Sequence, residues 1–154
     1  MASGMDQNRV NDFLNVAIGE ASTGTTALTN GFHGGGSNLG HIRLITPTVT
    51  WNSANNGTEL SGGSYVQGTG ITYATGPSGA FSASSYSSGA GSTSNNTTLS
   101  QTGMPAATII GIEIWDSAGT PLRWWWGALQ SQITTNNGDT LSFTSGAIVA
   151  TLTA

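Results

Sequence analysis

The stretch IIGIEIWDSAGTPLRWWWGAL, residues 109–129, predicts a β-hairpin and with it the fold class. In its first half, isoleucines alternate with other residues at a period of two, which is the spacing of a strand with one buried face. The segment SAGTP at 117–121 is typical of a hairpin loop. The chain then returns through three consecutive tryptophans, residues 124–126. We therefore expect two antiparallel strands, at 107–116 and 122–129.

Strict alternation along this hairpin assigns each side chain to one of two faces. The core face would carry Ile110, Ile112, Ile114, Leu122, Trp124 and Trp126. If Trp115 lies opposite Arg123, then Glu113 lies opposite Trp125, and these four side chains form one patch on the outer face. Burying one indole of about 150–250 Å² is worth roughly 4–6 kcal/mol before entropy costs. The outer tryptophans therefore need a cover, either the N-terminal helix or a neighbouring subunit.

Two earlier segments also have the pattern of short strands. HIRLITPTVTW, residues 41–51, alternates, although Pro47 restricts it to a sheet edge or to a break between two strands. SYVQGTGITYA, residues 64–74, predicts a strand that is weakened or bulged at Gly68 and Gly70.

The middle of the chain, residues 75–104, is rich in small polar residues. We expect two short strands there, around 80–84 and 97–100, joined by a surface loop. NNGD at 136–139 predicts a turn, and the segment 140–154 predicts two more short strands. Short strands separated by turns predict a mainly β protein, a single antiparallel β-sandwich of jelly-roll or immunoglobulin-like topology.

A short amphipathic helix is expected at the N-terminus. DQNRVNDFLNVAIGEA, residues 6–21, places apolar residues at helical spacing on one stripe. The stripe includes Val10, Phe13, Leu14 and Ile18. It would cap the sandwich or contact a neighbouring copy. We expect an N-terminal arm and helix over 1–24 and the sandwich, with a long polar loop near 75–104, over 25–154.

Composition excludes several classes of partner. Charged residues make up 6% of the chain, against about 25% in ordinary globular proteins. Lysine is absent, and the cations are Arg9, Arg43 and Arg123, which form no basic cluster. We therefore expect no nucleic acid partner, because phosphate binding depends on clustered cations. The chain has no apolar run of the roughly 18–20 residues that a membrane span needs, so we expect no membrane partner.

The residues that carry chemistry form no recognisable constellation. The chain has no cysteine, which excludes disulfides and thiolate metal ligands. Its seven acids lie on the predicted helix, in turns or in the sheet, and His33 and His41 lack the spacing of metal ligands. Ser145 lies outside a nucleophile elbow. We expect no catalytic residue, no cofactor and no metal, and hence no enzyme.

The order of these segments resembles a family of virion structural proteins of tailed bacteriophages. The resemblance rests on RVNDFLNVAIG, HIRLIT, TELSGGSYVQGTGITYA, the hairpin sequence above and NNGDTLSFTSGAIVATLT, which together cover residues 10–153. The third segment is similar to that family's Glu-hydrophobic-Ser/Gly-Gly-Ser-Tyr signature. The resemblance implies a small β-sandwich that assembles on the virion without catalysis, as a minor capsid or head-decoration protein or as a minor tail or tail-fibre protein.

We favour a capsid decoration protein that stabilises the head, because the chain is short and lacks fibre-like repeats. It would form a homo-oligomer, a trimer, and bind the major capsid protein or other virion proteins. The alternative is a minor tail or tail-fibre protein that binds host-surface glycans. The candidate interface residues are Val10, Phe13, Leu14, Ile18, Trp115, Arg123 and Trp125.

Aromatic rings could also form a sugar-binding platform. The candidates for stacking on sugar rings are Trp115, Trp125, Tyr65 and Tyr73. Interfaces between subunits are likewise enriched in tryptophan, tyrosine and arginine. Between the two, we favour the interface because of the family resemblance.

Overall fold

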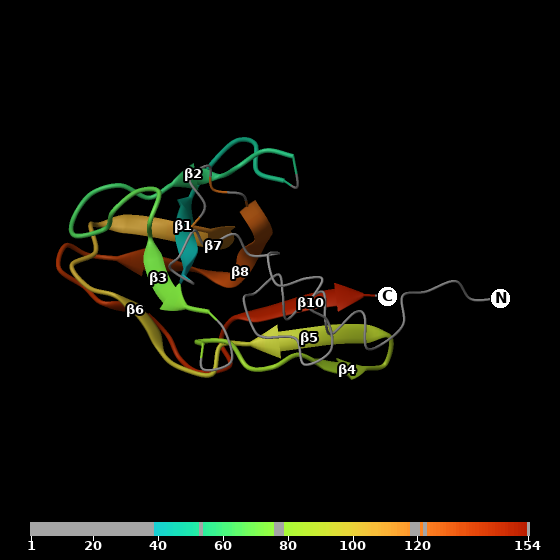
Figure 1. Cartoon of the computed structure of the whole chain (residues 1–154). Coiled ribbons are helices and arrows are strands. Elements are labelled where there is room, and N and C mark those ends of the chain that lie inside the picture. The colour runs from blue at the N-terminus through green and yellow to red at the C-terminus, as the bar shows by residue number, and fades with distance from the viewer. Residues whose placement is uncertain (1–38, 53, 76–78, 118–120, 122, 154) are drawn as a thin grey trace.

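A computed structural model describes residues 39–52, 54–75, 79–117, 121 and 123–153 of the chain. These residues form ten strands and no helix, and every pair of neighbouring strands is antiparallel (Figure 1). The prediction of a mainly β, antiparallel fold is therefore confirmed. The predicted helix at 6–21 and its apolar stripe lie outside the described residues.

The largest sheet has five strands in the order β2-β1-β7-β8, with β3 also paired to β1. Its strands are β1 (Leu39–Thr46), β2 (Thr58–Glu59), β3 (Ile71–Ala74), β7 (Ala107–Asp116) and β8 (Arg123–Thr135). β1 and β7 lie in the interior of this sheet, which matches their long apolar pattern.

Two smaller sheets complete the described fold. β10 (Val149–Thr153), β5 (Ala90–Ser94) and β4 (Ser85–Ser87) lie side by side at one end of the molecule (Figure 1). β6 (Leu99–Gln101) pairs with β9 (Leu141–Phe143). The strands are thus divided among three sheets, where the sequence led us to expect the two of a sandwich.

One cluster of buried residues joins the three sheets. Ile42, Leu44, Tyr73 and Ile114 contribute to it from the five-stranded sheet. The smaller sheets and their connections contribute Phe81, Leu99, Leu141, Phe143, Ile148 and Ala150. Burial of about 25 cal/mol per Å² of apolar surface makes this shared core the main favourable term of the fold.

The predicted strands agree with the structure in part. β1 ends at Thr46, directly before Pro47, because proline cannot donate a hydrogen bond to the neighbouring strand. β3 begins only at Ile71, after Gly68 and Gly70, which have positive φ values of 80° and 56°. β7 and the turn before β9 lie where the sequence places them, whereas β8 continues to Thr135, beyond the predicted end at 129.

The expected loop between 84 and 97 is the clearest difference. β4 and β5 form a hairpin there, joined by Ser88 and Gly89 with φ values of 52° and 84°. Two consecutive positive φ values suit a tight hairpin turn, and the Ser-Gly dipeptide is its sequence signal. The sequence pattern does not indicate this hairpin, because its small side chains (Ser, Gly and Ala) show no apolar alternation.

The register of the central hairpin corrects our assignment of faces. Trp115 lies opposite Arg123 as predicted, but Ile114, not Glu113, lies opposite Trp125. The register shifts by one residue between these two pairs, and Trp124 is the additional residue. A one-residue shift moves every following side chain to the other face.

The tryptophans that follow this shift therefore lie opposite to their predicted faces. Trp125 packs against the shared core beside Ile112, and Trp126 lies opposite Glu113 on the outer face. A second irregularity between Ile109 and Gly111 buries Ile109 completely and leaves Ile110 half-buried. The predictions of Trp125 as an outer residue and Trp126 as a core residue are wrong for this one physical reason.

Candidate functional site

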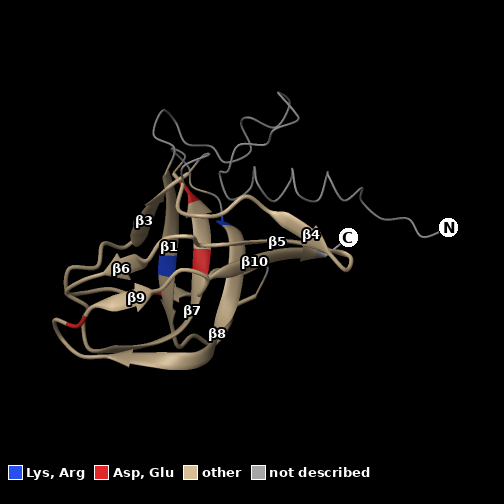
Figure 2. Cartoon of the chain, turned by 90° about the horizontal axis from the view of Figure 1, so that it is seen from below, with Lys and Arg blue, Asp and Glu red and all other residues tan. Residues whose placement is uncertain are grey.

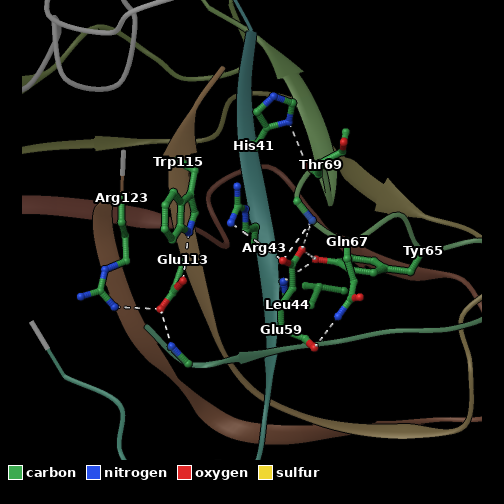
Figure 3. Close-up of polar contacts among 12 residues, drawn as sticks. His41, Arg43, Leu44, Glu59, Tyr65, Gln67, Thr69, Glu113, Trp115 and Arg123 are labelled. Carbon is green, nitrogen blue, oxygen red and sulfur yellow. Dashed lines mark hydrogen bonds and ion pairs between the residues drawn. The ribbon is translucent and has the colours of Figure 1, made fainter. Parts of the chain in front are cut away.

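The outer face of the five-stranded sheet is organised by one buried carboxylate, that of Glu113 in β7. Its Oε1 accepts hydrogen bonds from the Trp51 indole N–H and the Gly57 backbone N–H, both at 2.8 Å. Arg123 donates to the same oxygen at 2.8 Å, and the Trp115 indole donates to Oε2 at 2.9 Å (Figure 3). The Glu113 side chain is 2% exposed, so its charge is satisfied entirely by these donors.

Arg123 links this carboxylate to the loop that contains Asn52 and Asn55. Its Nη1 also donates to the Asn55 carbonyl at 3.0 Å, and its Nη2 donates to the Asn52 carbonyl at 2.8 Å. The Asn52 side-chain oxygen in turn accepts the backbone N–H groups of Ala54 and Asn55. The loop that begins at Trp51 is therefore held on the hairpin by side chains of the hairpin itself.

A second network adjoins the first across β1. The Arg43 guanidinium lies 3.9 Å above the centre of the Trp115 ring, a cation–π contact. Its Nη1 is 3.9 Å from an oxygen of Glu59, which accepts the Tyr65 hydroxyl at 2.8 Å. The Tyr65 oxygen accepts the backbone N–H of Leu44 at 3.0 Å. Burial raises the pKa of the Tyr65 hydroxyl above its ordinary value.

This second network explains the motif TELSGGSYVQGTG, residues 58–70. Glu59 also accepts the backbone N–H of Gly68, so the glutamate closes the loop between β2 and β3. At Gly70, φ is +56° and a Cβ atom would lie 2.2 Å from the Ile42 carbonyl oxygen. The glycine is needed for this close approach of two backbones. The motif therefore has a structural role: it closes the loop between β2 and β3.

Trp51 covers the outer face of β7. A Cβ atom at Gly111 would lie 2.0 Å from the Trp51 ring, so the absence of a side chain at 111 makes room for the indole. Trp51 meets Trp126 edge to face, with ring centres 5.4 Å apart and planes at 68°. Trp126 remains 43% exposed. The cover that we expected from the helix or from another subunit is supplied here by a loop of the same chain.

The structure brings together some of the predicted interface residues. Trp115 is 7% exposed and Arg123 has a side chain that is 9% exposed, and both bind Glu113 as part of one cluster. Trp125 lies outside this cluster, on the core side of β8. Val10, Phe13, Leu14 and Ile18 lie outside the described residues. A contact of any of these residues with another chain stays a prediction.

The rings expected to stack on sugars are mostly inaccessible. Tyr65, Tyr73 and Trp115 are 5%, 3% and 7% exposed, and Trp125 is half-buried. The exposed indole is that of Trp126, which sequence reasoning had placed in the core. Strict alternation cannot reveal it, because the bulge at Trp124 depends on pairing with β7.

Charge is concentrated inside the described part of the chain. Figure 2 shows charged residues at only a few places on the described ribbon. Both described arginines belong to the two networks. The fully buried Asp116 accepts the Trp124 indole N–H at 3.0 Å, and Asp139 accepts the Asn136 backbone N–H in a turn. The described residues contain no cluster of histidines and acids that could hold a metal ion. No helix among them is long and apolar enough to cross a membrane.

Comparison with known proteins identifies the family. No curated protein and no solved structure matches the chain. The family model described as podophage GP4 fiber I protein gp80 matches residues 39–151, well over half of the chain. The prediction of a non-enzymatic bacteriophage virion protein is confirmed, and the preference for head decoration is wrong, since the family is one of fibres. The chain therefore belongs to the family of the podophage GP4 fiber I protein gp80, which consists of structural proteins of phage tail fibres.

Proposed function

We propose that this chain is a fibre domain that contacts the surface of the host cell. The observation that carries the proposal is the family match over residues 39–151. A fibre projects from the particle, so its domains are placed to meet the host envelope before the rest of the virion does. The chain contributes binding, and its partners are other fibre chains, other virion proteins and a host-surface molecule.

The described surface favours recognition without charge attraction. The guanidinium groups of Arg43 and Arg123 are bound inside the protein, and the acids Glu59, Glu113 and Asp116 have internal donors. A surface of this kind binds through aromatic contacts and neutral hydrogen bonds. Such binding depends little on salt, because screening acts on exposed charges.

We further propose that copies of the chain associate into a homo-oligomer, a trimer. Symmetric copies would multiply a weak contact with the host surface into firm attachment through avidity. The apolar stripe of the predicted helix remains our candidate for the contact between copies. Arg123 would act in such a contact by holding the backbone at Asn52 and Asn55 in place. Trp115 would act by binding Glu113, which accepts hydrogen bonds from Trp51 and Gly57.

We also infer one sandwich-like domain from residue 25 to the end of the chain. The three sheets share a single buried cluster, which supports one cooperative unit. A single unfolding transition, seen alike by tryptophan fluorescence and by circular dichroism, is expected. Two separate transitions would contradict this inference.

Competition for adsorption tests the host-surface function. Host cells are incubated with the purified full chain, and the rate at which the phage adsorbs is then measured. We expect the chain to slow adsorption in a dose-dependent way, while a heat-unfolded sample does not. If the chain leaves adsorption unchanged and labelled chain does not bind the cells, the domain has only a structural role in the fibre.

The purely structural role is the second candidate. It is favoured by the burial of the rings at Tyr65, Tyr73 and Trp115, which removes the binding platform that the sequence suggested. In that case removal of the chain from the virion would yield incomplete fibres, and the added chain would not compete with the phage.

A further inference from the structure

We propose that an apolar groove between the central hairpin and β10 receives the N-terminal apolar stripe of a neighbouring copy of this chain. The stripe consists of Val10, Phe13, Leu14 and Ile18, which the sequence places on one side of an expected helix. The inference rests on the proposed association of copies and names the surface that the stripe contacts. Exchange of an identical segment between copies is a low-cost way to hold them together.

The groove reaches into the core that the three sheets share. Every described residue that lines it is apolar, and the lining includes Ile112, Ile114, Trp125, Ile148, Val149 and Ala150. Ile114, Ile148 and Ala150 belong to the buried cluster, and Trp125 packs against it. Val149, by contrast, is 59% exposed. An exposed apolar residue beside an apolar groove is a surface that an apolar segment can cover.

The size of the groove fits one side chain of the stripe. Its volume is about 70 Å³. A cavity of about 150 Å³ accepts benzene, and pockets that enclose a drug-sized molecule have about 300–1,000 Å³. One aliphatic side chain, such as that of Leu14, therefore enters the groove, and its neighbours lie against the border. Helices that bind grooves use anchors spaced at i, i+3 and i+4, which is the spacing of Val10, Phe13 and Leu14.

The position of the stripe in the chain places the groove within its reach. β1 begins at Leu39, and β7 alone separates it from β8, in which Trp125 lines the groove. Gly40 pairs with Asp116, two residues from the partner of Trp125 in β7. Neighbouring strands are about 4.8 Å apart, so the start of β1 lies roughly 10–15 Å from the groove.

The length of the connecting segment favours the groove of another copy. An extended chain crosses roughly 10–15 Å with about four residues, and connections within compact domains typically have about 4–6. Residues 22–38 are 17 residues that are mostly Gly, Ser, Thr and Asn, far more than contact with the same copy requires. Linkers of this composition and length reach roughly 20–25 Å, which brings the groove of an adjacent copy within range.

The charges of the chain permit this contact between copies. The stripe carries no charged side chain, and neither does the described lining of the groove. Arg43 and Arg123 are bound to Glu59 and Glu113 within the same chain. The surfaces that meet are therefore neutral, and charge repulsion between two copies acts only at longer range, where salt screens it.

Cross-linking through introduced cysteines tests the contact directly, because the chain has no cysteine of its own. Two full-length chains, Leu14→Cys and Val149→Cys, are mixed and treated with oxidised glutathione, and a tag on one of them distinguishes their masses. We expect a covalent pair of the two different chains. The matched controls are Asn15→Cys, on the polar side of the expected helix, and Val66→Cys, at a valine that is 61% exposed. Each control should cross-link about tenfold more slowly or less, because no contact raises the local concentration of its thiol.

Sedimentation of charged variants measures whether the contact holds the copies together. Phe13→Asp and Val149→Asp should each weaken association about tenfold or more, because each places a carboxylate in an apolar contact. Asn15→Asp and Val66→Asp introduce the same charge elsewhere and should associate as the unchanged chain does. An equal mixture of Phe13→Asp and Val149→Asp should form pairs, because one chain keeps an intact groove and the other an intact stripe. Circular dichroism confirms that each variant is folded.

The outcomes separate this inference from the proposed function. If the unchanged chain is an oligomer and the charged variants associate equally well, the association of copies stands and the groove is wrong. If Phe13→Asp dissociates the oligomer but Leu14→Cys and Val149→Cys form no pair, the stripe binds another surface and the inference fails. If the double variant Leu14→Cys/Val149→Cys closes a disulfide within one chain and the mixture forms no pair, the stripe binds its own copy, which overturns the exchange. A monomeric unchanged chain overturns the association and this inference together, whereas competition for adsorption measures the host-surface function separately.

Discussion

The two faces of strand β7, in the interior of the five-stranded sheet, are both covered, but by different chemistry. On the inner face, Ile42, Ile112 and Ile114 pack into the apolar cluster shared with the smaller sheets. On the outer face, the neighbouring residue Glu113 is equally buried and gathers two indoles, a guanidinium and a backbone amide. One strand, β7, serves both faces because its side chains alternate between them.

Because the two faces are covered by different chemistry, we expect them to differ in their tolerance to amino-acid substitution. Apolar packing is adaptable, because side chains of similar volume can replace one another. A buried carboxylate with four donors is less adaptable. If the carboxylate is removed, each donor is left without a hydrogen-bond acceptor in the protein interior. We therefore expect the outer face to fail more sharply than the inner face when one group is removed.

The largest expected effect is that of Glu113→Ala. It leaves the Arg123 charge and the indole N–H groups of Trp51 and Trp115 without their acceptor. Removal of one partner from a buried ion pair costs about 3–5 kcal/mol. Urea unfolding, followed by fluorescence, measures the loss. Glu113→Gln keeps one acceptor oxygen and should lose less, and equal stability of both variants to the unchanged chain would refute the importance of the network.

Ile114→Ala probes the inner face at the next residue of the same strand. The substitution opens a cavity in the core beside Trp125 and should cost about 2–5 kcal/mol. Ile114→Val, which removes a single methylene, should cost only about 0.5–1.5 kcal/mol. The same denaturation assay applies. A larger loss for Ile114→Val than for Glu113→Gln would reverse the ranking of the two faces.

Two glycines on neighbouring strands sharpen the comparison. Gly111→Ala places a methyl group where the Trp51 ring lies and should cost about 1–3 kcal/mol. Gly127→Ala meets nothing within 4 Å and should leave stability unchanged or raise it by up to about 1 kcal/mol. The double variant Gly111→Ala/Trp51→Ala should cost less than the sum of its parts, because the clash then has no partner. Additive losses would contradict the contact between Trp51 and Gly111.

The smallest effects concern two buried tyrosines. Tyr65→Phe removes a hydroxyl that binds Glu59 and Leu44, and should cost about 1–2 kcal/mol. Tyr73→Phe should be nearly neutral, because no described residue binds the Tyr73 hydroxyl. Thermal unfolding of both variants measures the difference. Similar losses at the two positions would show that the hydroxyl of Tyr73 has an acceptor after all, such as a buried water molecule.

The same tyrosines predict a loss of stability in alkali. Burial raises the pKa of Tyr65 and of Tyr73 above the ordinary value of 10.0. Above pH 10 the unfolded chain therefore releases protons that the folded chain retains, and stability falls as the pH rises. Lysine and cysteine are absent, so their side chains cannot obscure the effect. Unfolding at pH 9 and pH 11 measures the fall, which Tyr73→Phe should reduce, and equal pH dependence of that variant would exclude Tyr73 as a source.

The sequence predicted those parts of the fold in which local patterns and turn residues determine the strands. Alternation identified β1 and β7, Pro47 marked the end of β1, and the Asn-Asn-Gly-Asp turn before β9 is present with Gly138 at a φ of 88°. The hairpin at 85–94 was missed because small polar side chains carry no hydrophobic pattern. The pairing of Trp115 with Arg123 was predicted correctly.

The candidate site was only partly visible in the sequence. Glu113, Trp115 and Arg123 were expected as neighbours and are neighbours. Trp51 was missed, because 62 residues separate it from Glu113 in the chain. The exposure of Trp126 was missed because it follows from the bulge at Trp124.

By itself, the amino-acid sequence determined the class of the protein: antiparallel strands from period-two alternation and turn residues, and a surface poor in charge from the lack of lysine. Only the tertiary structure decided which tryptophan faces solvent and which carboxylate binds each indole. The physical reason is that alternation is a local property of a strand, whereas a bulge and a buried ion pair form only between two segments that are in contact in the folded chain. One additional residue in a paired strand exchanges its two faces, and no pattern within that strand alone records the exchange.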